Sequence, residues 1–181
     1  MWEDTNVEAN DADTKTPLGE APERSPKAEA EESFQRGYRL QMSGRLKEAI
    51  ESYQHSIDLV PSAEAHTFMG WAYSFLRQLD RAIEHCRTAI ELDPEFGNPY
   101  NDIGAYLIQQ GEYEEAIPYL ERALEATRYA SKHFPHYNLA RIYERQGKWF
   151  EALDEYKRAL ALEPDYTLAK EARYRLQALM N

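Results

Sequence analysis

The sequence contains a single cysteine, Cys86, among its 181 residues. An intrachain disulfide and a cysteine-rich zinc site are therefore both excluded. The chain also lacks any apolar run that approaches the ~18–20 residues a membrane helix requires. Its first five residues, Met-Trp-Glu-Asp-Thr, show neither the basic nor the apolar segment of a secretory signal. These absences predict a soluble protein, which we expect in the cytoplasm.

Positive charge is scarce as well. The 21 lysines and arginines are outnumbered by 32 acidic residues, which gives a formal net charge of −11. Nucleic acids and anionic membranes are themselves negative, so this balance disfavours both as partners. Charged residues at 29% and hydrophobic residues at 43% are typical of a globular protein. The length suits one domain or a short repeat array.

Residues 1–29 differ in composition from the rest of the chain. They carry eight acidic and three basic residues, three of the nine prolines and few apolar side chains. Such a segment cannot bury enough apolar area to offset the entropy of ordering it. We predict a disordered acidic tail over 1–29, which acts either as a solubilising arm or as a docking segment with Trp2 as its anchor. Thr16-Pro17 and Ser25-Pro26 are compatible with phosphorylation.

The remainder of the chain repeats itself at intervals of 33, 34 and 36 residues, measured between the members of one small-residue column. That column consists of Gly37, Gly70, Gly104 and Ala140, a second consists of Ala49, Ala82, Ala116 and Ala152, and Pro61, Pro94 and Pro164 close three of the four units. Apolar residues recur at helical spacing in two blocks per unit. The pattern predicts four helical hairpins over 30–62, 63–96, 97–132 and 133–166.

Several residues indicate where these helices end. Gly44, Gly111 and Gly147 lie between the two blocks of their units, where a helix terminus favours positive φ, and Arg77 holds that place in the second unit. Asn98 is predicted to cap the helix that opens with Pro99. Pro118 falls inside a predicted helix, so a slight kink is expected there.

Two quoted segments carry a family resemblance. FMGWAY…RAIEHCRTAIELDP and LARIYERQGKWFEALDEYKRALALEP resemble the tetratricopeptide repeat (TPR) family. The resemblance implies an all-α fold, a right-handed α-solenoid of antiparallel helix hairpins. Residues 167–181 are similar to the capping helix that shields the last hairpin. The third unit has 36 residues and Arg128-Tyr129-Ala130-Ser131 in place of its closing proline, which leaves its stacking angle on the fourth unit open.

The resemblance also implies a function. TPR arrays line a concave groove with the first helix of each hairpin and bind peptides or helices there. The repeat register places eleven partner-binding candidates on that face: Phe34, Tyr38, Met42, Thr67, Trp71, Phe75, Asn101, Ile108, Tyr137, Arg141 and Arg145. Phe134 adds a sixth aromatic, and aromatic-rich patches mark interaction sites. We therefore expect a non-catalytic adaptor or scaffold that binds a peptide or helix of another protein, with the ligand's acidic end near the two arginines.

Other functions stay open. The chain is alternatively a structural or self-assembling subunit, in which the groove or the repeat ends form a homo-oligomer. The acidic tail is a further candidate for the groove, lying in cis near Arg141 and Arg145. One TPR subclass clamps a carboxylate with Lys and Asn residues, but this groove face has no lysine and offers only Asn101 with the two arginines.

Catalytic motifs are missing from the sequence. It has no phosphate-binding glycine loop, nucleophile elbow or paired-histidine metalloprotease motif. His133 and His136 are three residues apart without a third ligand, and His66 and Cys86 are expected to meet inside one hairpin as two ligands, short of a tetrahedral zinc site. We expect neither an enzyme nor a cofactor or metal.

Overall fold

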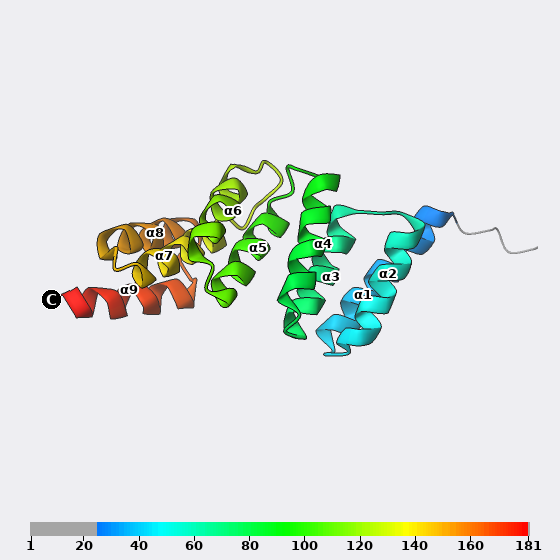
Figure 1. Ribbon diagram of the computed structural model, residues 1–181, viewed down its shortest axis with the longest axis horizontal. Coiled ribbons are helices and arrows are strands. Elements are labelled where there is room, and N and C mark those ends of the chain that lie inside the picture. Colours follow the sequence, from blue (N-terminus) through cyan, green and yellow to red (C-terminus); the bar gives the residue numbers. More distant parts are fainter. Residues whose placement is uncertain (1–24, 181) are drawn as a thin grey trace, which may run out of the picture.

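The computed structural model describes residues 25–180, so the predicted acidic tail lies outside the described residues as far as residue 24. Helices stack side by side along one axis, from α1 and α2 at one end to α9 at the other (Figure 1). Their bounds are α1 Pro26–Met42, α2 Leu46–Leu59, α3 Ala63–Phe75, α4 Leu79–Leu92, α5 Gly97–Gln110, α6 Tyr113–Glu125, α7 His133–Arg145, α8 Trp149–Leu162 and α9 Thr167–Met180. The predicted all-α solenoid is confirmed. Within the described range, no helix is long and apolar enough to cross a bilayer.

The turn inside each hairpin has the backbone geometry predicted from the sequence. Gly44, Gly111 and Gly147 adopt φ values of 78°, 88° and 73°. Arg77 adopts φ 61° at the equivalent place in the second hairpin, the one non-glycine residue between 25 and 180 with positive φ. A left-handed residue lets the chain reverse directly after the first helix.

The small-residue columns bring the two helices of each hairpin close together. A Cβ built on Gly104 lies 2.4 Å from Cδ2 of Leu120, and one built on Gly37 lies 2.7 Å from the Tyr53 ring. Leu120, Tyr53 and the alanine column at Ala49, Ala82, Ala116 and Ala152 are fully buried. A larger residue at these glycines would force the helices apart.

Two helix starts differ from the prediction. Helix α1 begins at Pro26, ahead of the expected residue 30, because the Ser25 side chain accepts a hydrogen bond from the Ala28 amide at 3.3 Å and proline fits the first helical turn. Helix α5 begins at Gly97, so Asn98 lies in its first turn and is not the N-cap. Pro118 lies inside α6, which continues as one helix.

The helices form two layers. Helices α1, α3 and α5 each contact the next odd-numbered helix, so the odd-numbered helices form the inner layer. Their partners α2, α4, α6 and α8 pack outside them. Helix α9 covers the last hairpin, since Ala169, Ala172 and Leu176 are buried against Tyr156 and Ala159 of α8, as predicted for a capping helix.

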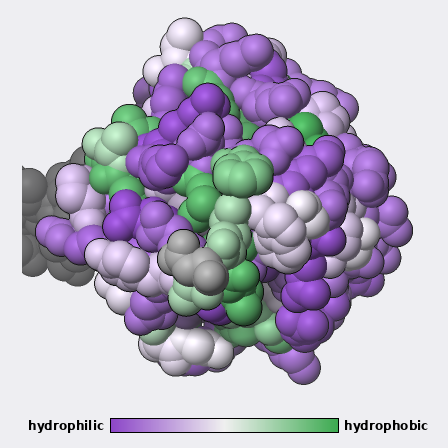
Figure 2. Space-filling model, turned by 90° about the vertical axis from the view of Figure 1, so that its left-hand side faces the viewer, coloured by the Kyte–Doolittle hydropathy of each residue, from purple (hydrophilic) through white to green (hydrophobic). Residues whose placement is uncertain are grey.

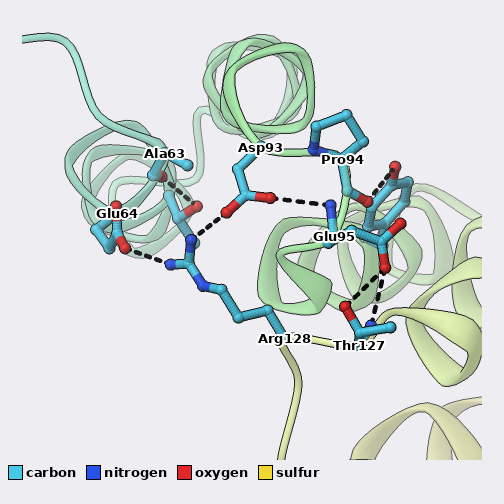
Figure 3. A network of polar contacts seen from close by, with 9 residues as sticks. Ala63, Glu64, Asp93, Pro94, Glu95, Thr127 and Arg128 are labelled. Carbon is cyan, nitrogen blue, oxygen red and sulfur yellow. Dashed lines mark hydrogen bonds and ion pairs between the residues drawn. The ribbon is translucent and has the colours of Figure 1, made fainter.

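The third unit is two residues longer than the second, and we call residues 126–132 at its end the clasp. The clasp lies alongside the turn between α4 and α5, with a parallel bridge between Arg128 and Phe96 (Figure 3). The Arg128 amide donates to the Glu95 carbonyl at 2.9 Å, and the Gly97 amide donates to the Arg128 carbonyl at 3.2 Å. The Arg128 guanidinium pairs with Glu64 at the start of α3 and with Asp93 after α4. One side chain therefore ties the third hairpin to both helices of the second.

A second set of contacts holds the clasp from its other side. The Thr127 amide and hydroxyl both donate to the Glu95 carboxylate, at 3.1 and 2.9 Å, and Arg122 pairs with the same carboxylate at 2.9 Å. These hydrogen bonds, from Thr127 first and from Arg122, lower the pKa of Glu95. Thr127 and Arg128 thus bridge back from the end of the third unit to the second unit.

Candidate functional site

The eleven predicted partner-binding residues all lie on the inner-layer helices α1, α3, α5 and α7. They differ in accessibility. Tyr38, Met42, Phe75 and Arg145 are exposed, and Phe34, Trp71, Tyr137 and Arg141 are partly buried. Three are buried, which removes most of their surface from any partner: Thr67, Asn101 and Ile108.

Aromatic residues of α1 and α3 form one continuous cluster. Phe68 lies at its centre, with ring centroids 5.3 Å from Phe34, 5.7 Å from Tyr38 and 5.8 Å from Trp71. Trp71 in turn lies 5.5 Å from Phe75. The structure therefore brings four of the predicted aromatics together through a residue outside the predicted set. Such edge-to-face contacts hold the rings in place while leaving part of their surface free.

Phe68 belongs to a sequence column that the prediction overlooked. The residues two places before the small-residue column are Gln35, Phe68, Asp102 and Asn138. Three of these four take part in the inner face, Phe68 by its ring and the other two by polar contacts. The four residues share no chemical type. Variation at a fixed position of the repeat is the sequence signal that could have identified this column.

A hollow of about 400 Å³ opens beside this cluster, between α3, α5 and the clasp. Its lining combines aromatic and polar side chains: Thr67, Phe68, Trp71, Asn98, Asn101, Asp102, Tyr129, Ser131 and Phe134. We call it the central pocket. It includes predicted groove residues from α3, α5 and α7, together with Tyr129 and Ser131 from the insertion.

Asp102 is the one carboxylate among the residues that line the central pocket. It is partly buried, and burial raises its pKa to about 7, although the hydrogen bond from Asn101 at 3.4 Å acts in the opposite direction. Between residues 25 and 180, no lysine or arginine lies within ion-pair distance of it. The pocket therefore contains an acid without a counter-charge.

A chain of side-chain hydrogen bonds leads from this acid to α7. The Asn138 amide donates to Asn101 at 3.1 Å, and Arg141 donates to Asn138 at 3.1 Å. The Arg141 guanidinium also lies 5.7 Å from the centre of the Tyr137 ring. The Arg141 side chain is thus bound to residues of its own helix, α7. Asn101 connects the Asp102 carboxylate to Asn138.

The C-terminal part of the inner face carries charges of both signs. A second hollow of about 700 Å³ there is lined by Arg141, Arg145, Glu144 and Arg175 among others. Glu144 accepts a hydrogen bond from Tyr156 at 2.8 Å and pairs with Arg175 at 2.7 Å. The two predicted arginines therefore face a region that already contains a carboxylate.

The remaining two predicted aromatics belong to a separate cluster at the start of α7. The Phe134 ring centroid lies 5.6 Å from Tyr166, and Tyr137 lies 5.1 Å from the same ring. Phe134 stays exposed on one side and borders the central pocket. The six aromatics thus form two groups, with the central pocket between them.

His66, His85 and Cys86 all lie on the two helices of the second hairpin. His66 meets His85, with their Nδ1 atoms 3.1 Å apart. Burial lowers the pKa of both histidines and raises that of Cys86, which is fully buried in the core. In the described part of the chain, no three His, Cys, Asp or Glu residues gather as metal ligands would.

Comparison with known proteins identifies the family. Sequence models described as tetratricopeptide repeat match residues 63–96 and 96–162, together more than half of the chain. The chain belongs to the tetratricopeptide repeat family. The resemblance read from the glycine, alanine and proline columns is thereby confirmed.

Two relatives match over only part of their own length. Small glutamine-rich tetratricopeptide repeat-containing protein 2 from Mycosarcoma maydis is 30% identical over 99 residues, which covers 54% of this chain and 28% of the relative. The protein of the same name from Saccharomyces cerevisiae is 26% identical over 121 residues, covering 66% and 32%. The chain spans about a third of the length of these relatives or less.

Solved structures show the same fold. Pseudomonas aeruginosa PilF superposes with a TM-score of 0.81 at 21% identity, over 87% of this chain and 71% of that one. YrrB, described as a TPR protein with an unusual peptide-binding site, superposes with a TM-score of 0.66 at 20% identity, over 80% and 74%. At these identities the likeness concerns the fold alone.

Proposed function

We propose that this TPR protein is a non-catalytic adaptor that binds a peptide or helix of another protein along the inner face of α1, α3, α5 and α7. The observation that carries the proposal is the continuous aromatic cluster beside the central pocket. Tyr38 and Phe75 of that cluster are exposed, and Trp71 borders the pocket. The family is consistent with a role in protein interaction, and the structurally similar YrrB is described as having a peptide-binding site.

The physical basis is the burial of aromatic surface that is already ordered. Phe68 fixes the neighbouring rings by contacts of 5.3–5.8 Å, so the site loses little conformational freedom when a partner binds. Large aromatics in such positions carry much of the binding energy in protein interfaces. A partner with apolar side chains at intervals matching the two aromatic groups would bury both at once.

Selection from random peptides tests the proposal and does not require the identity of the partner. Twelve-residue peptides displayed on phage are selected against the full chain and then measured for binding to Trp71→Glu and Phe150→Glu. Phe150 is 74% exposed on the outer-layer helix α8, so it gives the same kind of substitution away from the inner face. We expect Trp71→Glu to lose the selected peptides and Phe150→Glu to retain them.

Circular dichroism confirms that both variants keep the helical fold before binding is compared. Equal retention of the peptides by both variants would contradict the proposal, because binding would then lie elsewhere on the chain. Loss in both variants would also contradict it, since the effect would not depend on the inner face.

A second function has one observation in its favour. At the end of the solenoid that carries α9, apolar side chains are exposed among a mostly hydrophilic surface (Figure 2). Leu168, Tyr174 and Leu179 of α9 all belong to the exposed large hydrophobic residues. We propose self-association through this end as the alternative. Light scattering should then show a dimer or larger species that Leu179→Glu converts to a 21.1 kDa monomer, and a monomeric wild type would contradict it.

A further inference from the structure

We propose that the central pocket binds the side-chain cation of a lysine or arginine in the partner peptide, with Asp102 as its counter-charge and the surrounding rings as its walls. This inference rests on the proposed function and specifies the chemistry of its ligand. It differs from the expectation drawn from the sequence, which placed an acidic part of the ligand near Arg141 and Arg145.

The carboxylate at this place lacks an internal partner. Its hydrogen bond from Asn101 is long, at 3.4 Å, and no cationic side chain between residues 25 and 180 pairs with it. Three groups near Asp102 have pKa values that its negative charge helps to raise: Cys86, Tyr106 and Tyr129. All three stay neutral at physiological pH and so do not offset the charge. A lysine or arginine side chain of the ligand would supply the positive charge that is missing beside Asp102.

Two arginines on the elements around the pocket, one in the clasp and one on α7, are held by other partners. Arg128 pairs with Glu64 and Asp93 and lies 4.4 Å from the centre of the Phe96 ring. Arg141 donates to Asn138 on its own helix. Neither guanidinium is paired with Asp102, so neither supplies the missing charge.

The walls of the pocket suit a cation as well. Phe68, Trp71, Tyr129 and Phe134 all line it. Aromatic faces attract lysine and arginine side chains, and tryptophan does so most strongly. The methylene part of a long basic side chain would pack against the same rings, with its charged end at Asp102. An acidic or purely apolar side chain would gain only part of these contacts.

The insertion in the third unit completes the pocket. Tyr129 comes from the clasp, and its side chain lies so close to Gly97 that a Cβ there would be 2.3 Å from the tyrosine Cβ. Tyr129 is therefore fixed against the start of α5, while Ser131 lines the pocket beside it. The hydrogen bonds between the clasp and residues 95–97 hold this wall in place. Tyr129 and Ser131 of the clasp thus build one side of the site.

The test compares peptides selected by the full chain and by two matched variants. Random twelve-residue peptides displayed on phage are selected separately against the wild type, Asp102→Asn and Asp154→Asn. Asp102→Asn removes the charge while keeping the shape, and Asp154, exposed on α8 and paired with Lys157, gives the same substitution away from the pocket. We expect lysine or arginine at one fixed position in the wild-type and Asp154→Asn peptides, and no such preference in the Asp102→Asn peptides.

Synthetic peptides then measure how much the basic residue contributes to binding affinity. Replacing the preferred basic residue by norleucine should weaken binding to the wild type roughly tenfold or more, because a charge-assisted contact is lost. The same replacement should change binding to Asp102→Asn by less than about twofold. Lysine and arginine versions of one peptide show which of the two cations fits better.

The outcomes separate this inference from the proposed function. If the selected peptides depend on Trp71 but show no basic preference, or if norleucine has equal effects on wild type and Asp102→Asn, the cation pocket is wrong and the peptide groove stands. If no selected peptide depends on Trp71, both are wrong. Circular dichroism of each variant excludes loss of the fold as the cause.

Discussion

Asp102 occupies the repeat position that Phe68 holds in the second unit and Asn138 in the fourth. The backbone is equivalent at all three places, because the small residue two positions later packs against the second helix of each hairpin. Only the side chain changes. A single column thus supplies an aromatic hub, an acid and a link in a hydrogen-bond chain to one surface.

The acid should make the folded state more stable at low pH. Burial raises the pKa of Asp102 to about 7, from an ordinary value of 3.8. Below that ordinary value the side chain is protonated in both states, and its contribution to stability is fully present. As pH rises towards 7 the unfolded chain loses the proton first, so this contribution to the free energy of unfolding is lost. The full shift corresponds to at most about 4 kcal/mol, less any screening by water.

Urea unfolding at a series of pH values between 4 and 8 measures this effect. The free energy of unfolding of wild type minus that of Asp102→Asn should fall across the series and level off above pH 7, because titrations shared by both proteins cancel. A difference that stays constant with pH would show that Asp102 titrates normally.

Gly104 tests the close approach of helices in the third hairpin. Gly104→Ala places a Cβ 2.4 Å from Leu120 Cδ2, so we expect a loss of roughly 1–3 kcal/mol in unfolding free energy. Leu120→Ala alone should cost about 2–5 kcal/mol by leaving a cavity. The double variant should be more stable than the sum of the two losses indicates, since the smaller side chain makes room for the added methyl. Strict additivity in chemical denaturation would contradict the tight contact.

The hairpins themselves followed from local sequence, whereas the clasp did not. Glycines at the turns, and Arg77 in place of one, could be predicted because the need for positive φ is a property of a few neighbouring residues. The contact between Arg128 and Glu64 joins residues 64 apart in the sequence, and no pattern within one repeat indicates it. The sequence therefore located the insertion without revealing what it binds.

Arg128 should keep the clasp ordered but contribute little to the stability of the whole protein. In Arg128→Gln the ion pairs to Glu64 and Asp93 are lost. Because these pairs are partly exposed, we expect a change below about 1 kcal/mol in unfolding free energy. Amide hydrogen exchange in residues 126–132 should nevertheless accelerate at low salt. Arg45→Gln, which removes an exposed pair with Glu48 on α2, should leave that segment unchanged. If residues 126–132 were equally protected from exchange in both variants, Arg128 would not hold the clasp in place.

Helix α9 offers a matched pair of leucines for the capping role. Leu176 is fully buried against the last hairpin, whereas Leu179 is 72% exposed. Leu176→Ala should cost about 2–5 kcal/mol, and Leu179→Ala close to zero. Hydrogen exchange should increase first in α8 and α9, because repeat proteins lose structure from their ends. Similar losses in both variants would show that α9 does not pack as described.

Across the whole molecule, the predicted residues lie on α1, α3, α5 and α7, but the register of the repeat did not resolve which of them are accessible. Thr67 is buried, whereas Phe34 and Tyr137 at the same register position are only partly buried. Accessibility depends on how closely successive hairpins stack, and that is set by contacts between units. The aromatic content of the face could be predicted, and the central pocket, which needs the clasp, could not.

The location of peptide binding is the central claim, and nuclear magnetic resonance tests it most directly. A peptide selected against the full chain is titrated into the ¹⁵N-labelled protein, and shifts of the backbone amides and the three tryptophan indole signals are followed. We expect the Trp71 indole and amides of α3, α5 and the clasp to shift together with one affinity. Shifts confined to α2, α4, α6 and α8, or to α9, would contradict binding at the inner face.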